Sequence, residues 1–332
     1  MDIFFPKYYK EFACIASLCP DSCCKEWSVD VDEDAARFYR GLTGPLGDRL
    51  RQVLQDTPDG TVMTIENGRC PMWRQDGLCR IQAELGHDAL CKTCREFPRL
   101  RHDYGDFVEL GLEMSCPEAA RLILSDTESL WETQSESGEG VPEYDREMMS
   151  ILRRTRMEFL DFLSSTPLPI PHILAVLLLY AYDAQEELDG GEPAILTPER
   201  YLNDVARLPL QGDIDSLLDF FLSLEILTPQ WKSLLQGLAK APVWDIQYKA
   251  LLRYFISRYW LQAISDFDIV CRAKFAIIAC VLIGHLGANL AETAQLFSKE
   301  IENDPDNMDA ILDGAYTTRA FTDLNLLGLL LT

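Results

Sequence analysis

The chain has 332 residues, of which 48% are hydrophobic and 25% charged, and this ordinary composition excludes a largely disordered protein. Its length exceeds what one hydrophobic core usually fills, so we expect two domains. The formal net charge of −23 argues against a nucleic-acid partner, because binding to phosphates depends on a basic surface, and favours a basic or cationic partner. A solvated acidic surface that only maintains solubility explains the charge equally well.

The sequence contains no pattern typical of secretion or of a membrane span. Its first twelve residues, MDIFFPKYYKEF, lack the basic and apolar regions of a secretory signal, which predicts a cytoplasmic protein. The most apolar runs, residues 173–182 and 275–284, are shorter than the ~20 residues that cross a bilayer, and we interpret both as buried core helices. In a reducing compartment, a dense set of cysteines binds metal more often than it forms disulfides.

The first 126 residues alternate between short strand patterns and short helix patterns. Asp32 is a suitable N-cap for the helix that follows it, and Asn67-Gly68 is a typical hairpin turn. Strands are predicted at residues 27–31, 61–65 and 107–112. Helices are predicted at residues 32–42, 46–54, 79–90, where Gly86 interrupts the pattern, and 117–124, with a turn at 91–101. These patterns predict a small, mixed, cysteine-rich domain over residues 1–126.

Helical patterns dominate after a short acidic segment. Residues 127–145 contain six acidic residues and no basic one, so we predict an exposed linker over residues 127–142. Candidate helices follow at residues 148–163, 172–188, 198–208, 213–226, 229–238, 244–267, 269–286, 290–302 and 306–330. Residues 143–332 therefore form a predicted all-α domain, and the predicted fold class of the chain is α+β, mostly α.

Nine of the eleven cysteines lie between Cys14 and Cys116, and this density is hard to explain by packing alone. Three of them precede a proline, which suits ligands that project from loops around a metal. Cys271 and Cys280 are isolated in apolar helical segments, where a free thiol behaves as a small buried hydrophobe. We favour a metal site for the nine over a disulfide framework or unligated core thiols.

The spacing of the cysteines disfavours two kinds of redox site but leaves the metal open. Cys91 and Cys94 form a C-x2-C pair, yet the βαβ context of a thiol–disulfide oxidoreductase is missing. Cys19 and Cys23 match the first half of a radical-type C-x3-C-x2-C loop, but its last position is occupied by Glu26. Zinc and iron–sulfur clusters both accept four thiolates, and no histidine stands at ligand-like spacing from the cysteines.

The N-terminal region contains five ordered blocks, which span about the first 125 residues: F-x-C-I, C-x3-CC-x2-W, CPMWRQDGLCRIQAELG, TCREFPR and SCPEAARL. Together they resemble the flagellin lysine-N-methylase (FliB-type) family, whose members carry a CxxCxxCC-type zinc- or iron-chelating domain. Residues 248–276 resemble the helical C-terminal part of that family more loosely. One departure is that Glu26 precedes the tryptophan, where the family pattern leads us to expect a glycine.

The resemblance implies methylation of surface lysines on flagellin, with S-adenosylmethionine as methyl donor and an iron–sulfur cluster, expected to be [4Fe–4S], in the cysteine domain. Zinc is the alternative metal. A metal-stabilised binding protein without chemistry, such as a flagellin chaperone or adaptor, is the alternative function. No nucleic-acid or membrane partner is expected, and neither the catalytic residues nor the donor pocket can be assigned from the sequence. The candidate metal ligands, with Cys91 ranked below them, are Cys14, Cys19, Cys23, Cys24, Cys70, Cys79, Cys94 and Cys116.

Overall fold

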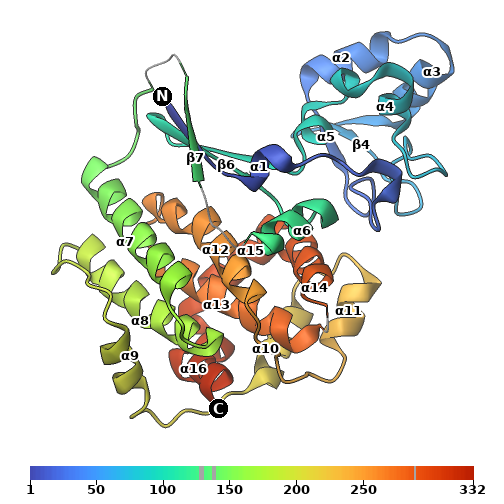
Figure 1. Cartoon of the computed structure of the whole chain (residues 1–332). Coiled ribbons are helices and arrows are strands. Elements are labelled where there is room, and N and C mark those ends of the chain that lie inside the picture. Colours follow the sequence, from blue (N-terminus) through green and yellow to red (C-terminus); the bar gives the residue numbers. More distant parts are fainter. Residues whose placement is uncertain (127–130, 137–139, 288) are drawn as a thin grey trace.

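The computed structural model describes residues 1–126, 131–136, 140–287 and 289–332. A smaller lobe, which carries most of the cysteines, stands beside a larger body of helices that is covered on one side by a sheet (Figure 1). We call these parts the cysteine lobe, residues 14–96, and the helical body, which includes the sheet. The predicted fold class, α+β and mostly α, is confirmed.

The cysteine lobe is built from short elements around a three-stranded antiparallel sheet of order β2-β4-β3. Its elements are η1 (Ala16–Leu18), β2 (Val29–Val31), α2 (Glu33–Gly41), α3 (Gly44–Val53), β3 (Leu54–Thr57), β4 (Gly60–Met63), α4 (Arg80–Leu85), η2 (His87–Ala89) and α5 (Lys92–Glu96). Asp32 caps α2 as predicted, accepting from the Ala35 amide, and also accepts from the Lys92 amide at 2.7 Å. This carboxylate therefore joins the start of α2 to the start of α5.

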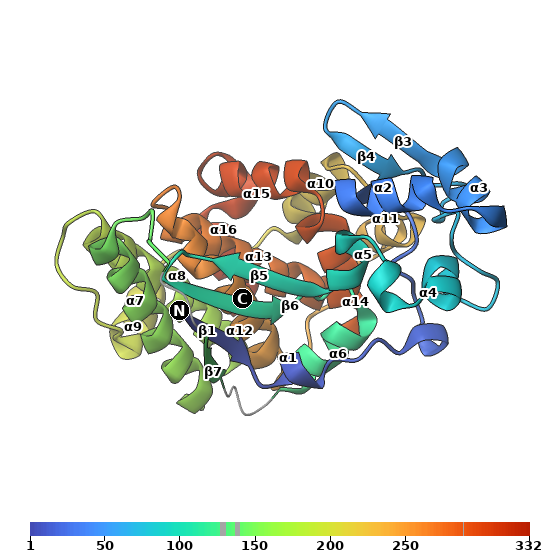
Figure 2. The same cartoon turned by 90° about the horizontal axis from the view of Figure 1, so that it is seen from above.

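A four-stranded sheet of order β5-β6-β1-β7 lies across the helices of the body (Figure 2). Its strands are β1 (Asp2–Pro6), β5 (Arg99–Asp103), β6 (Phe107–Leu112) and β7 (Trp131–Ser135), and α1 (Tyr8–Glu11) and α6 (Pro117–Ser125) flank it. The central pair β1 and β6 is parallel, with Ile3 opposite Val108, and the outer pairs are antiparallel. The first residues of the chain thus complete a sheet whose other strands come about 100 residues later.

The remaining elements form the helical part of the body. They are α7 (Arg146–Ser165), α8 (Ile170–Leu188), α9 (Pro198–Val205), α10 (Ile214–Ser223), α11 (Pro229–Leu235), α12 (Gln247–Tyr259), η3 (Trp260–Ile264), α13 (Ile269–Leu286), α14 (Leu290–Phe297), the π-turn η4 (Ser298–Glu302), α15 (Pro305–Thr317), η5 (Arg319–Phe321) and α16 (Asp323–Leu331). Helix α13 is long and apolar enough to cross a membrane, but 94% of it is buried inside the protein. It is the central core helix that the sequence predicts.

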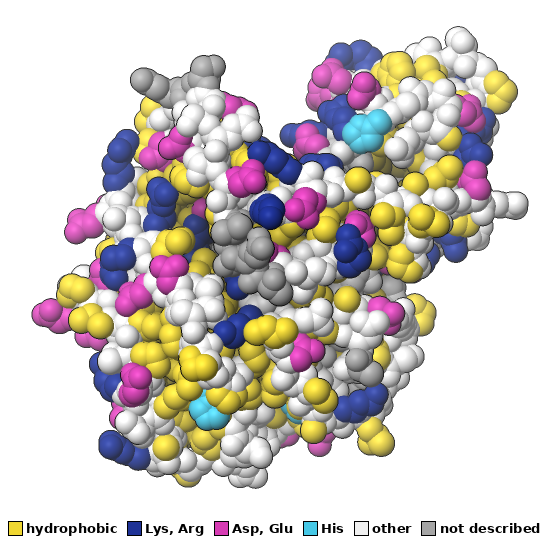
Figure 3. Space-filling view, in the orientation of Figure 1, with side chains coloured by type: hydrophobic (Ala, Val, Ile, Leu, Met, Phe, Trp, Pro, Cys, Tyr) yellow, Lys and Arg dark blue, Asp and Glu magenta, His cyan; other side chains and the backbone are white. Residues whose placement is uncertain are grey.

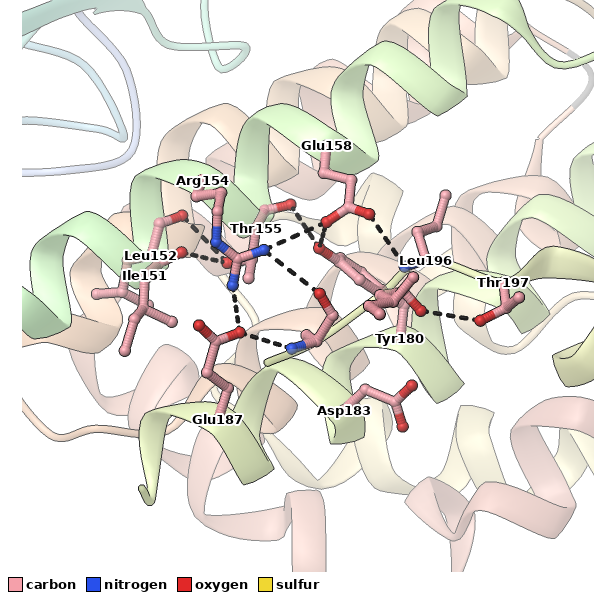
Figure 4. Close-up of polar contacts among 12 residues, drawn as sticks. Ile151, Leu152, Arg154, Thr155, Glu158, Tyr180, Asp183, Glu187, Leu196 and Thr197 are labelled. Carbon is pink, nitrogen blue, oxygen red and sulfur yellow. Dashed lines mark hydrogen bonds and ion pairs between the residues drawn. The ribbon is translucent and has the colours of Figure 1, made fainter. Parts of the chain in front are cut away.

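Polar contacts fasten the segment between α8 and α9 to α7 (Figure 4). Glu158 of α7 accepts from the Tyr180 hydroxyl at 2.7 Å and from the Leu196 amide at 3.0 Å. Glu187 accepts from the Ala194 amide at 2.7 Å and is paired with Arg154. This part of the body is held by its own side chains and lies far from the cysteine lobe.

The hydrophobic cores are not divided at the predicted domain boundary. Phe107, Leu112 and Ile123 are buried in one continuous core with the helices of the C-terminal half, whereas the cysteine lobe has a separate small core around Tyr39 and Leu50. The division into residues 1–126, 127–142 and 143–332 stays a prediction. Within the expected linker, Trp131–Ser135 form β7, which the prediction did not foresee, and residues 127–130 and 137–139 lie outside the described part.

Several predicted elements are confirmed and several are wrong at their ends. The strands predicted near residues 29, 62 and 110 are present as β2, β4 and β6. The helical pattern predicted over residues 79–90 is interrupted at Gly86, as expected, because its φ of 89° cannot continue a helix, and η2 follows it. The turn predicted at residues 91–101 contains the one-turn helix α5 and the start of β5. The long helix predicted over residues 306–330 is split into α15, η5 and α16.

Candidate metal centre

Six cysteines from separate segments of the cysteine lobe lie close enough to influence one another's ionisation. Backbone pairing brings these segments together. The Cys70 amide donates a hydrogen bond to the Cys24 carbonyl at 2.8 Å, and Trp73 and Cys79 form an isolated antiparallel β-bridge. Cys91 and Cys94 lie one turn apart at the start of α5. The six, five of them predicted ligands, are Cys23, Cys24, Cys70, Cys79, Cys91 and Cys94.

Thiol pairs dominate the electrostatics of this group. The Cys24 thiol and burial raise the pKa of Cys23, and the Cys91 thiol and burial raise the pKa of Cys94. The Cys23 thiol lowers the pKa of Cys24, but the Cys70 thiol and burial outweigh it and raise that pKa to about 12. A hydrogen bond from the Cys94 thiol stabilises the Cys91 thiolate and lowers the pKa of Cys91 to about 7. Most of these thiols are therefore protonated at neutral pH, and a metal that binds them must displace protons.

The other three predicted ligands lie at the edge of this group. Cys14 and Cys23 both raise the pKa of Cys19, after the larger effect of burial. Burial raises the pKa of Cys116 to about 12, with smaller contributions from Cys19 and Cys23. Cys116 lies at the N-terminus of α6, in the helical body, so the cysteines extend across the junction between the two parts of the molecule.

The chemistry of this donor set fits a thiophilic metal, although the thiols are not arranged in a closed coordination shell. Among the described residues, no three histidine, cysteine or acidic side chains converge tightly enough to hold a metal ion as they stand. Cys70 and Cys91 are buried and the remaining seven are partly or fully exposed, so the group is accessible from one side. Thiolates are ligands for both zinc and iron–sulfur clusters.

The structure separates these nine cysteines from the other two as the sequence predicts. Cys271 and Cys280 are buried in α13, and burial alone raises the pKa of Cys280 above its ordinary range. Cys91, which the sequence ranked below the others, is the most buried of the nine and contacts the same neighbours. Its position makes it as good a candidate ligand as Cys94, and the choice of ligands stays a prediction.

Lys299 connects the cysteine lobe to the helical body, and sequence reasoning missed it. Its side chain is 2% exposed, and its ammonium lies 3.0 Å from Asp21 Oδ2, 2.6 Å from Glu26 Oε2 and 5.0 Å from the centre of the Trp27 ring. Burial opposes ionisation of Asp21, but Lys25 and Lys299 lower its pKa to about 2. An ion pair between residues 278 positions apart leaves no periodic signal in a sequence.

Glu26 adopts a strained backbone conformation at this contact. Its φ of 73° lies in the left-handed region, which glycine occupies without cost and other residues occupy at about 1–2 kcal/mol. This is the position where the sequence pattern led us to expect glycine. The departure is explained by the side chain, because only an acidic residue here supplies the second carboxylate to Lys299.

The turn that carries Lys299 also anchors two other elements. Residues 298–302 form a π-turn, a conformation often found at functional sites. Glu300 accepts from the Leu227 amide at 2.8 Å and from Thr228, ahead of α11. Glu302 accepts from Tyr254 at 3.0 Å and Tyr259 at 2.7 Å, on α12. Three charged side chains of this one turn, Lys299, Glu300 and Glu302, thus fix the cysteine lobe, α11 and α12 to one another.

Comparison with known proteins finds relatives in Salmonella. Over 138 residues the chain is 31% identical to the flagellar biosynthetic protein FliU of Salmonella muenchen, a match that covers 38% of this chain and 78% of FliU. It is also 31% identical over 138 residues to the lysine-N-methylases of Salmonella typhimurium and Salmonella choleraesuis, and this match covers 33% of their length. No protein-family model and no solved structure matches the chain.

Proposed function

The chain belongs to the flagellin lysine-N-methylase (FliB-type) family, and from this premise we propose that it methylates surface lysines of flagellin with S-adenosylmethionine as donor. The observation that carries the proposal is the 31% identity to two proteins named lysine-N-methylase. The matched part is a third of those relatives, so the activity, the donor and the substrate are proposals for this chain. The net charge of −23 supports a cationic protein substrate and a cationic donor.

We further propose that the cysteine lobe binds an iron–sulfur cluster of the [4Fe–4S] type, with zinc as the alternative. The gathered thiols support this assignment. A bound cluster would either anchor the amino and carboxylate groups of the donor at an open iron or hold the lobe in shape. A site built on free thiols needs a reducing compartment, and we therefore propose that the protein is cytoplasmic.

The proposed reaction is a polar displacement. The lone pair of a deprotonated lysine amine forms a bond to the donor methyl carbon while the carbon–sulfur bond breaks, and the electron pair stays on sulfur as S-adenosylhomocysteine. The lysine proton must first pass to a base. A carboxylate or a tyrosine then accepts the proton.

The test is incubation of anaerobically purified protein with flagellin and S-adenosylmethionine labelled in the methyl group. We expect label on flagellin lysines, and a brown preparation that contains iron and sulfide. If the preparation instead contains stoichiometric zinc and no sulfide, the metal site is a zinc site and not an iron–sulfur cluster. Absence of label with the metal intact would favour the second candidate, a flagellin chaperone or adaptor, for which the name of FliU as a flagellar biosynthetic protein is the supporting observation.

A further inference from the structure

A cleft of about 530 Å³ opens where the cysteine lobe meets the helical body. One wall is formed by residues 20–26 of the lobe, a second by the start of α11 at Gln230, and a third by α14 and the π-turn, including Glu292 and Gln295. Pockets for small molecules usually measure about 300–1,000 Å³ and often lie between domains. The cleft therefore has the size and the location of a small-molecule site.

The walls of the cleft are held in place by buried polar contacts. Lys299 ties Asp21 and Glu26 of the lobe to the π-turn, as described above. Gln295 donates to Asp21 Oδ2 at 3.2 Å and to the Ser115 carbonyl at 2.8 Å, so α14 is fixed to the lobe and to the segment that precedes α6. A ligand that enters such a pre-organised cleft loses little free energy in ordering it.

The cleft borders the cysteines on two sides. Pro20 and Pro117 line it, and each directly follows a candidate metal ligand, Cys19 and Cys116. Figure 3 shows the face of the molecule on which the cysteine lobe adjoins the helical body. A ligand in the cleft would touch both the segment that leads into the proposed cluster and the helical body.

The charges that line the cleft suit a ligand with both an ammonium or sulfonium group and a carboxylate. Glu292 is exposed and has no ion-pair partner in the described part of the chain, so its carboxylate is available to a cation. Lys25 lines the same cleft and is partly exposed beside Asp21, at 2.8 Å, which leaves some of its donors for an anion. Asp21 and Glu26 are both paired with Lys299, and Asp21 is also paired with Lys25, so Glu292 is the carboxylate of the cleft without such a partner among the described residues.

The other cavities are less suitable for such a ligand. Two cavities of about 40 and 10 Å³ behind the sheet are too small. A cavity of about 470 Å³ is lined by Arg146, Arg153 and Arg154, which repel a cation. A cavity of about 390 Å³ lies at the Asp103–Gly105 turn, at the end of the sheet away from the cysteine lobe.

We infer that the cleft between the cysteine lobe and the helical body is the binding site of the methyl donor, with Glu292 facing its cationic part. This inference rests on the proposed function and names the donor site that the function requires. The acceptor lysine must then approach through the open side of the cleft. Gln230, which has no side-chain hydrogen bond within the described residues, lines the cleft and offers a position at which it can be blocked.

The test is titration calorimetry of S-adenosylmethionine into the cofactor-loaded full chain, without flagellin. We expect Glu292→Lys to weaken binding about tenfold and Gln230→Trp to weaken it at least tenfold. Asp309→Lys, a change of equal charge on the exposed face of α15, and Lys232→Trp, on α11 outside the cleft, are the matched controls and should bind as the unchanged protein does. Circular dichroism of all four variants confirms that each is folded.

Methyl-transfer kinetics separate the failure of this inference from that of the proposed function. Transfer of label with unchanged donor affinity in both cleft variants would overturn the inference and leave the function standing. A raised KM for flagellin with unchanged donor affinity would also overturn it, since the cleft would then bind the acceptor. If the unchanged protein neither binds the donor nor transfers label, the proposed function fails and the inference fails with it.

Discussion

The cysteine lobe and the helical body are stabilised by cores of very different kinds. The core of the lobe consists of fourteen buried residues among those described, and two of these, Cys70 and Cys91, are candidate metal ligands. The core of the body is far larger, is centred on α13 and contains aromatic rings packed edge to face, such as Phe255 against Phe275 and Phe297. A small core seldom supports a fold alone, whereas a metal contributes its binding free energy directly to folding. The comparison predicts that the lobe depends on the proposed metal for its stability and that the body does not.

Removal of the metal should have the largest effect and should be confined to the lobe. We expect chelation under anaerobic conditions to lower the hydrogen-exchange protection of residues 29–91 at least a hundredfold, because ligation is replaced by protonated thiols. Protection of α13 should change less than threefold. Hydrogen exchange followed by mass spectrometry measures both regions in one sample. Restoring iron and sulfide is the control, and an equal loss in both regions would show that the two parts do not differ in this way.

Breaking the buried ion pair of the body should have the next largest effect. Arg156 donates to Glu109 Oε2 at 2.8 Å and joins α7 to β6, and both side chains are only 7% exposed. Arg156→Met leaves a buried carboxylate without its partner, which costs about 3–5 kcal/mol of unfolding free energy. Denaturant unfolding of the body measures the loss.

The matched control for that pair is the double change Glu109→Leu with Arg156→Met. Removal of both charges leaves no buried unpaired group, so we expect most of the stability to return. The metal content of the lobe should be the same in all three proteins. Loss of metal in Arg156→Met would show instead that the stability of the lobe is coupled to the body.

Lys299→Met should have a smaller effect, located at the junction of the two parts. The carboxylates that it leaves behind, Asp21 and Glu26, are 21% and 27% exposed, so solvent screens them and the expected cost is about 1–2 kcal/mol. We also expect a larger radius of gyration by small-angle X-ray scattering, because the lobe is released from the π-turn. Lys25→Met, which removes a more exposed partner of Asp21, should leave the radius unchanged. A compact Lys299→Met variant would mean that other contacts hold the lobe.

Local patterns in the sequence were sufficient to predict many of the helices and strands. They were also sufficient to distinguish the nine N-terminal cysteines from Cys271 and Cys280. The Asp32 cap, the three strands with alternating residues and the buried thiols of α13 all follow from neighbouring residues. Each of these features depends on interactions within one turn or one strand, where the spacing of side chains is fixed by the backbone.

Long-range pairings could not be predicted in this way. Strand β1 pairs with β6 and β7, more than 100 residues away, and only the assembled sheet gives its residues their partners. The sequence around Lys299 predicts only a helix. The ion pairs of its ammonium are formed with carboxylates near the other end of the chain. The ligands of the proposed metal likewise depend on the fold, because the sequence offers nine cysteines and the fold decides which of them lie together.

The two groups of cysteines provide the smallest and most discriminating prediction. Cys280 is fully buried in α13 and has no polar neighbour that shifts its ionisation, so its thiol only fills space. Cys280→Ala leaves a small cavity and should cost about 1–2 kcal/mol of unfolding free energy with no loss of iron. Cys70→Ala removes a side chain of similar size and burial from the lobe, where we expect metal content to fall by half or more. The ratio of iron to protein in the two variants checks both outcomes together. Equal iron in the two would exclude Cys70 as a ligand, and loss of iron from Cys280→Ala would contradict the independence of the body from the metal.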